Sequence, residues 1–256
     1  MMSLWVRFAR ADENGFGTVE GETIAVHDGD MFGRSAPTGE KLPMSDVSLL
    51  TPTRPKTFVG LWNNYRAAAE KQGNAIPEEP LYFLKSTGSL LAHGGTIPKP
   101  PRYDGRVLYE GELGIVIGRT ARDLDEEAAG AAIFGYTCVN DVTALDLLAS
   151  DPSFAQWSRA KSFDGFGALG PAIATGLDPA SLVVRTLVNG RERQNYPAAD
   201  MIFPPARLVS LISRDLTLEP GDVIACGTSL GSGVLRPGML VEVAIDGIGT
   251  LANRFE

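Results

Sequence analysis

The segment Glu110-Gly111-Glu112 places two carboxylates two residues apart in a stretch that has the character of a β-strand. Side chains alternate between the faces of a strand, so Glu110 and Glu112 are expected to point the same way. Two like charges on one face repel, and a hard divalent cation with oxygen ligands can relieve that repulsion. Asp141 would supply a third carboxylate. The spacing alone leaves an alternative open, in which the acids face solvent on an edge strand.

Three further ionisable residues each allow a functional and a structural interpretation. Asp141 could be a metal ligand, or it could cap a helix predicted over residues 142–149. Lys161 lies in an apolar segment and could stabilise negative charge, or it could be a surface lysine with a buried stem. His93 follows Ala92 and precedes two glycines, which is typical of a loop histidine as well as of a base.

The composition excludes several classes of function. A net charge of −8 without any basic run argues against a nucleic-acid partner, because phosphate binding needs clustered Lys and Arg. No stretch approaches the roughly 18 apolar residues of a membrane span, and the first residues lack the apolar core of a secretory signal. Cys138 and Cys226 both lie in apolar stretches and are interpreted as buried thiols. We therefore expect a cytoplasmic protein.

Two common hydrolytic sites are not supported. Residues 227–231 match G-x-S-x-G, but the glycines and the proline of 231–238 cannot form the helix that must follow the serine. Both histidines precede Ser229, whereas that type of site places its histidine after the serine. Zinc is not expected either, because the two His and two Cys show no paired spacing. Residues 227–238 could still form a glycine-rich loop whose backbone approaches a small anionic substrate, and this alternative is left open.

Turn-forming residues predict a β-rich chain that divides into two parts. The sequence contains 29 Gly and 17 Pro, which indicate many turns and therefore short strands. Residues 4–28 are predicted to form strands around a hairpin turn at Asp12-Glu13-Asn14-Gly15. The proline-rich stretch 51–55 suggests a small N-terminal β-rich domain over 1–53 and a main domain over 54–256.

Within the main domain we predict a mixed α/β arrangement. Residues 64–72 are expected to form a helix that Gly73 ends. Prolines and glycines predict irregular structure over 73–105, while 113–118 should be a buried strand. Residues 241–245 and 249–253 are expected to form a closing hairpin.

Taken together, several segments resemble the fumarylacetoacetate hydrolase family over residues 54–256. The matching segments are 109–118, 135–142, 161–166, 218–224 and 247–253. The resemblance implies a mixed β-sandwich roll, usually a homodimer. It also implies Mg²⁺ or Mn²⁺ held by Glu110, Glu112 and Asp141, with Lys161 and Thr228 facing the substrate.

The chain departs from the family pattern where water would be activated. Relatives that hydrolyse usually carry Asn-Tyr-x-x-His followed by a Glu three residues later. Here those positions are Ala68 and Lys71, with Glu70 one position away from the expected Glu. We therefore name Glu70 and His93 as candidate bases. Tyr65 and Arg159 are named as candidate substrate-binding residues.

The substrate end of the site departs as well. Leu145 and Leu148 stand where many members have Arg and Gln, so that end is expected to be less polar. The expected function is metal-dependent hydrolysis of a C–C bond in an acylpyruvate-like 2-oxo acid or 1,3-diketone, with Lys161 stabilising an enolate. One alternative is a decarboxylase or isomerase of a 2-oxo or 2-hydroxymuconate-type diacid. Another is a non-catalytic relative that binds metal and 2-oxo acid.

Overall fold

A large, mostly antiparallel sheet runs through the computed structural model, which describes residues 2–11 and 13–256. In spatial order its main strands are β4 (Ser35–Pro43), β3 (Thr23–Gly29), β2 (Glu13–Glu20), β1 (Ser3–Arg10), β14 (Gly167–Thr175), β12 (Ile133–Asp141), β11 (Gly111–Ile117), β17 (Val223–Ala225), β6 (Phe58–Trp62) and β7 (Leu81–Lys85). Two short strands join it, β5 (Ser48–Leu49) beside β1 and β8 (Leu90–Leu91) beside β14.

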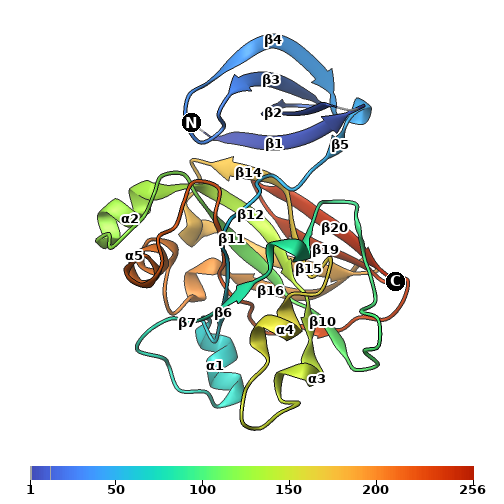
Figure 1. Ribbon diagram of the computed structural model, residues 1–256, viewed down its shortest axis with the longest axis vertical. Helices are drawn as coiled ribbons and strands as arrows, with labels where there is room; N and C mark the ends of the chain where they lie inside the picture. The colour runs from blue at the N-terminus through green and yellow to red at the C-terminus, as the bar shows by residue number, and fades with distance from the viewer. Residues whose placement is uncertain (1, 12) are drawn as a thin grey trace.

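Strands β1 to β5 form an N-terminal β-domain at one end of the molecule (Figure 1). The pairing of β1 with β14 joins this domain to the main sheet. The N-terminal β-rich domain is thus confirmed, whereas a boundary between residues 53 and 54 stays our proposal.

The hairpin between β1 and β2 forms, but the turn predicted at Asp12-Glu13-Asn14-Gly15 does not include its last three residues. Arg10 pairs with Glu13 and Phe8 pairs with Gly15, so Asn14 and Gly15 belong to β2. Asp12 lies outside the described residues. Gly15 has a packing role instead, because a Cβ there would approach the Phe8 ring to 2.5 Å.

A second sheet packs against the main sheet and encloses the core between them. Its order is β16 (Arg191–Pro197), β15 (Val183–Val188), β19 (Leu240–Ile245), β20 (Gly249–Phe255) and β9 (Thr96–Ile97). Leu113 and Ile115 of β11 pack in one cluster with Val243 of β19 and Leu251 of β20. Val116 faces the opposite side of β11, so this strand is buried on both faces. The closing hairpin, β19 and β20, is confirmed.

The remaining elements are short. A third sheet contains β13 (Thr143–Ala144), β10 (Val107–Tyr109) and β18 (Gly233–Val234). The helices are α1 (Arg66–Gln72), α2 (Glu126–Ala132), α3 (Leu145–Leu148), α4 (Trp157–Lys161) and α5 (Pro205–Asp215), with 3-10 turns η1 (Met44–Asp46), η2 (Thr87–Ser89), η3 (Pro179–Ser181) and η4 (Ala198–Asp200). As predicted, Gly73 ends α1 in the left-handed conformation, with φ of 70°.

Two further local predictions were wrong, and both of these errors concern the site described below. Residues 73–105 were predicted to be irregular, yet they contain β7, which pairs along β6. Residues 142–149 were predicted to be helical, yet only Leu145–Leu148 is. The segment before α3 pairs with β10 instead, so its backbone hydrogen bonds are used in a sheet.

The two thiols, Cys138 and Cys226, are buried and free, as predicted. Within residues 2–11 and 13–256, no helix has both the length and the apolar character needed to cross a bilayer.

Candidate metal centre and active site

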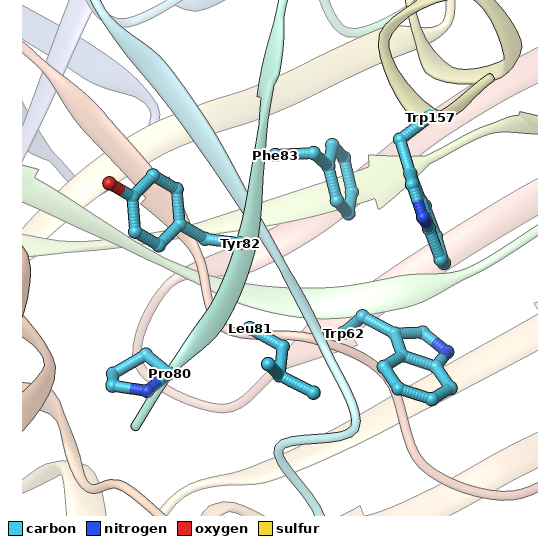
Figure 2. A pocket seen from close by; sticks show the side chains of 6 residues that line it. All are labelled: Trp62, Pro80, Leu81, Tyr82, Phe83 and Trp157. Carbon is cyan, nitrogen blue, oxygen red and sulfur yellow. The ribbon is translucent and has the colours of Figure 1, made fainter. Parts of the chain in front are cut away.

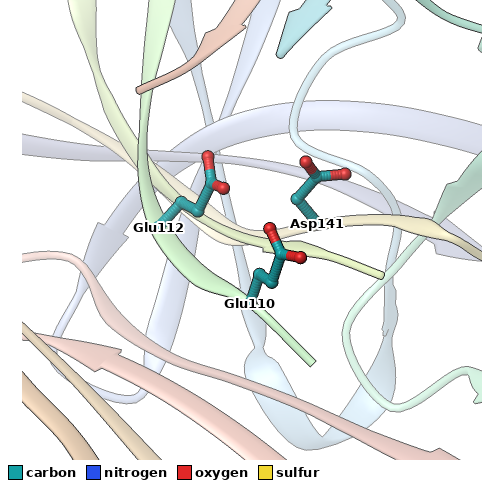
Figure 3. A group of neighbouring side chains, drawn as sticks. All are labelled: Glu110, Glu112 and Asp141. Atoms are coloured by element: carbon teal, nitrogen blue, oxygen red, sulfur yellow. The ribbon is translucent and has the colours of Figure 1, made fainter. Parts of the chain in front are cut away.

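Three carboxylates meet where β11 and β12 run side by side (Figure 3). Glu110 directly precedes β11, Glu112 is its second residue, and Asp141 is the last residue of β12. The register pairs Gly111 with Asn140, and the amide of Asp141 donates to the carbonyl of Glu110 at 2.8 Å. One oxygen from each carboxylate lies within 4.8 Å of the others. The predicted convergence of Glu110 and Glu112 is therefore seen, and Asp141 is brought to the same place.

Gly111 fixes the two glutamates through its own backbone. Its amide donates to Oε1 of Gln194 at 3.0 Å, and its carbonyl accepts from Oγ1 of Thr228 at 2.9 Å and from the Tyr196 hydroxyl. A Cβ at position 111 would lie 2.0 Å from Oγ1 of Thr186, so no larger residue fits without movement. The central residue of Glu-x-Glu is thus a glycine for reasons of space.

Two ammonium groups contact the carboxylates. Nζ of Lys161 lies 2.9 Å from Oε2 of Glu110 and 2.6 Å from Oδ2 of Asp141. Nζ of Lys85 lies 2.6 Å from Oδ1 of Asp141 and also donates to the carbonyl of Lys161. The side chains of Lys85 and Asp141 are fully buried. Asp141 is therefore a buried ion-pair partner and not the helix cap that its sequence context allowed.

Glu112 is the least satisfied of the three carboxylates. Its Oε2 accepts from the amide of Gly227 at 2.8 Å, but its buried Oε1 has no hydrogen-bond partner. Burial, and then the charge of Asp141, raise the pKa of Glu112 well above its ordinary value. A buried carboxylate oxygen without a donor is costly unless a positive group meets it.

Burial and neighbouring charges shift the pKa values of Asp141, Lys161 and Lys85 in opposite directions. Burial would raise the pKa of Asp141, but Lys161 and Lys85 lower it overall. Burial would lower the pKa of Lys161, but Asp141 and Glu110 raise it overall, so Lys161 keeps its proton. Burial lowers the pKa of Lys85, and Asp141 opposes that shift.

The residues present fit a hard divalent cation. Three carboxylates face two ammonium groups, so one negative charge at a buried place is uncompensated when all three carboxyls are ionised. Oxygen donors alone are what Mg²⁺ and Mn²⁺ prefer, and the buried Oε1 of Glu112 has no hydrogen-bond partner that a cation would have to displace. Glu110, Glu112 and Asp141 would hold such an ion.

A cavity of about 220 Å³ opens beside the carboxylates and is called the catalytic pocket below. It is lined by Leu61, Trp62, Asn63, Ala68, Gln72, Phe83, Leu108, Glu110, Leu145, Leu148, Trp157, Lys161, Thr228, Ser229 and Ser232. Among these described lining residues, Glu110 and Lys161 are the ionisable ones.

Some of the predicted site residues lie elsewhere. Glu70 is exposed on α1 and Arg159 is exposed on α4, and neither lines the pocket. Nδ1 of His93 accepts from the amide of Ala252 at 3.1 Å, outside the pocket lining. Tyr65 is fully buried against Tyr196, with ring centroids 4.9 Å apart. The structure thus brings Lys161 and Thr228 to the carboxylates, but not Glu70, His93, Arg159 or Tyr65.

Lys85, Gln194 and Tyr196 also contribute to the site but were not predicted from the sequence. Lys85 ends the segment Leu81-Tyr82-Phe83-Leu84-Lys85, in which Phe83 and Lys85 are the buried positions. A lysine at an inward-facing position of an alternating strand signals a buried charge that needs an acidic partner.

Comparison with known proteins agrees with this geometry. The family model described as fumarylacetoacetate (FAA) hydrolase C-terminal matches residues 57–256, and the model described as Rv2993c-like, N-terminal matches residues 4–52. Oxaloacetate tautomerase YisK of Bacillus subtilis is 37% identical over 225 residues, which cover 82% of this chain and 74% of that protein.

Solved structures of enzymes show the same fold. The 2-hydroxyhepta-2,4-diene-1,7-dioate isomerase from Mycobacterium marinum superposes with a TM-score of 0.90 at 37% identity, covering 100% of this chain and 98% of that one. Maleylpyruvate hydrolase from Sphingobium sp. SYK-6, solved with manganese(II) and pyruvate, gives 0.78 at 26% identity, covering 97% and 98%. Given the extent of the family match and these relatives, the chain belongs to the fumarylacetoacetate hydrolase family.

Proposed function

We propose that this chain is a Mg²⁺- or Mn²⁺-dependent enzyme that forms and reprotonates the enolate of a small 2-oxo acid. Tautomerisation, isomerisation or decarboxylation would all pass through that enolate. One observation carries the proposal. The catalytic pocket is lined by Lys161 and by Glu110 of the acidic triad, which can stabilise an enolate, but no histidine that could activate water is among its described lining residues.

The residues of the chain can divide the work as follows. When bound by Glu110, Glu112 and Asp141, a divalent cation would act as a Lewis acid toward the 2-oxo group. Lys161 stays protonated, because its carboxylate neighbours raise its pKa, and it lines the pocket. It can therefore donate a hydrogen bond to the substrate oxygen on which negative charge develops. The Thr228 and Ser229 side chains border the same space.

Hydrolysis would need one more component. A water molecule must lose a proton as it attacks the distal carbonyl, which requires a base within hydrogen-bond reach. The position of the family's lid histidine is Ala68, which lines the pocket with a methyl group. Glu70 and His93 do not line the pocket. Loss of CO₂ forms the enolate without removing a proton, whereas exchange at C3 needs an acceptor for the C3 proton. Among the described residues that line the pocket, Glu110 is the carboxylate that could take up this proton and return it, while Lys161 stabilises the enolate.

Hydrolysis of an acylpyruvate remains the second candidate. The similarity to maleylpyruvate hydrolase favours it, since that protein was solved with manganese(II) and pyruvate. A non-catalytic binding protein is less supported. Such a protein has little use for Lys161, whose buried ammonium group reaches both Glu110 and Asp141.

We also propose a cytoplasmic homodimer whose partner is a small 2-oxo acid, with no nucleic acid and no membrane involved. The support is the family membership and the negative net charge of −8.

Deuterium exchange at C3 of pyruvate, followed by NMR in D₂O, tests the proposed function. We expect exchange that depends on added Mg²⁺ and that Lys161→Met lowers by about a hundredfold or more, because one charge-stabilising donor is lost. Acetylpyruvate should exchange at C3 without being cleaved. Cleavage of acetylpyruvate to acetate and pyruvate at the exchange rate would show hydrolysis instead. If the protein binds Mg²⁺ but catalyses neither exchange nor cleavage, that result would favour a non-catalytic binding protein.

A further inference from the structure

An aromatic groove adjoins the catalytic pocket. The groove is lined by Trp62, Pro80, Leu81, Tyr82, Phe83 and Trp157 and encloses about 570 Å³ (Figure 2). Trp62, Phe83 and Trp157 also line the catalytic pocket. The three shared side chains bring the groove next to the place where a ligand beside the carboxylates would lie.

Stacked rings connect the reacting end to this groove. Nζ of Lys161 lies 5.1 Å from the centroid of the Phe83 ring. Phe83 stacks on Trp157 with centroids 5.3 Å apart and an interplanar angle of 15°, and Trp157 lies 5.9 Å from Trp62. Trp62 is 40% exposed and Leu81 is 41% exposed, so both still offer apolar surface that a ligand could cover.

The polarity of the pocket decides what that ligand can carry. Leu61, Leu145 and Leu148 contribute apolar surface to its wall. Lys161 is the only cationic side chain among the described lining residues, and it already contacts Glu110 and Asp141. A second carboxylate at the far end of a substrate would lose its water without gaining a cation, which is unfavourable. A phenyl or alkyl group would instead be covered by aromatic side chains.

We propose that the 2-oxo acid carries a bulky apolar group at its distal end, held in the aromatic groove, and no second carboxylate there. This inference rests on the proposed 2-oxo acid chemistry. It separates this chain from the related Mycobacterium marinum isomerase, whose name specifies a dioate.

Two probes test the proposal directly. In 2-oxo-4-phenylbutanoate and 2-oxoglutarate the reacting C3 methylene is the same, and the distal end is a phenyl ring in one and a carboxylate in the other. With the Mg²⁺-loaded protein, kcat/KM for deuterium exchange at C3 should favour the phenyl compound by at least about tenfold. An equal rate, or a preference for 2-oxoglutarate, would overturn the proposal.

Two leucines of β7 provide a matched pair of variants. Leu81 lines the groove and is 41% exposed, whereas Leu84 is 44% exposed and lies outside the groove lining. Leu81→Ala should lower the phenyl-to-carboxylate ratio about three- to tenfold, and Trp62→Ala should lower it about tenfold. Leu84→Ala should leave the ratio unchanged. Equal effects of the two leucine variants would contradict the assignment. The assignment would also be contradicted if Trp62→Ala changed the oligomeric state but left the phenyl-to-carboxylate ratio unchanged. In that case a second copy of the chain would cover the groove.

The proposal can fail separately from the proposed function. If pyruvate and both probes show no exchange, the enolate chemistry is wrong, and calorimetry then decides the substrate class. Tighter binding of 2-oxo-4-phenylbutanoate than of 2-oxoglutarate to the Mg²⁺-loaded protein would support an apolar distal group. Equal or weaker binding would overturn it.

Discussion

Asp141 lies between two buried ammonium groups, and this determines how the centre behaves without a cation. Lys85 contacts one of its oxygens and Lys161 contacts the other, each at 2.6 Å. Removing one partner of a buried ion pair leaves the other charge uncompensated, which usually costs far more than losing a surface pair. Lys85 therefore acts as a positioning residue, since it holds Asp141 and the backbone of Lys161 and does not line the pocket.

Replacing Lys85 by methionine should lower the free energy of unfolding of the metal-free protein by about 3 to 5 kcal/mol. Added Mn²⁺ should recover part of that loss, because the cation compensates the charge of Asp141 and binds only the folded state. Urea denaturation with and without Mn²⁺ measures both effects. Lys99→Met is the control, since Lys99 pairs with Asp104 at the surface, where about 0 to 1 kcal/mol is expected. An equal loss in Lys85→Met with and without Mn²⁺ would contradict this role.

At the scale of elements, the centre depends on how closely β11 approaches β15. Thr186 of β15 occupies the space that a Cβ of residue 111 would need, with its Oγ1 at 2.0 Å. That Oγ1 has no hydrogen-bond partner, so removing it sacrifices no hydrogen bond. The next contacts of such a Cβ, with Oε1 of Gln194 and Cβ of Thr186, are at 3.3 Å. The positions of Glu110 and Glu112 therefore depend on the missing side chain of Gly111 and on the small side chain of Thr186 that faces it.

Gly111→Ala should destabilise the protein by about 1 to 3 kcal/mol, because the methyl group forces β11 and β15 apart. The double variant Gly111→Ala/Thr186→Ala should recover most of the stability that Gly111→Ala loses. Gly130→Ala is the control, since its Cβ would be 3.4 Å from Ala206 and alanine favours helix α2. Thermal unfolding of the four proteins measures the effect. A double variant no more stable than Gly111→Ala would show that Thr186 is not the obstacle.

Local periodicity predicted part of the site, and long-range pairing determined the rest. The alternation of a strand placed Glu110 and Glu112 on one face, and the segment before Asp141 has clear strand character, so the acidic group could be predicted. The role of Lys85 could not be predicted, because the prolines and glycines around β7 indicated irregular structure. The partner of this strand, β6, is separated from it in the sequence by a helix and a loop. Gln194 and Tyr196 reach Gly111 from β16, more than 80 residues away along the chain. Nothing in their local sequence indicates that contact.

At the scale of the whole molecule, the centre is assembled from segments that meet only in the folded chain. β11 and β12 of the main sheet supply the carboxylates, β7 and α4 supply the lysines, and β15 and β16 of the second sheet support the backbone. The family match over residues 57–256 covers all of these elements. The N-terminal domain joins the same sheet through β1 but adds no residue to the catalytic pocket among those described.

The central claim is that Glu110, Glu112 and Asp141 hold a divalent cation, and calorimetric titration with Mn²⁺ tests it most directly. Burial raises the pKa of Glu112, so this carboxyl takes up a proton at a higher pH than an ordinary glutamate does, and any proton that it holds must leave when the ion binds. Mn²⁺ affinity should therefore increase with pH until Glu112 is ionised. Glu112→Gln should bind about a hundredfold more weakly and lose that contribution to the pH dependence, whereas the exposed Glu127→Gln should behave as wild type. Equally tight Mn²⁺ binding by Glu112→Gln would contradict the assignment of this centre.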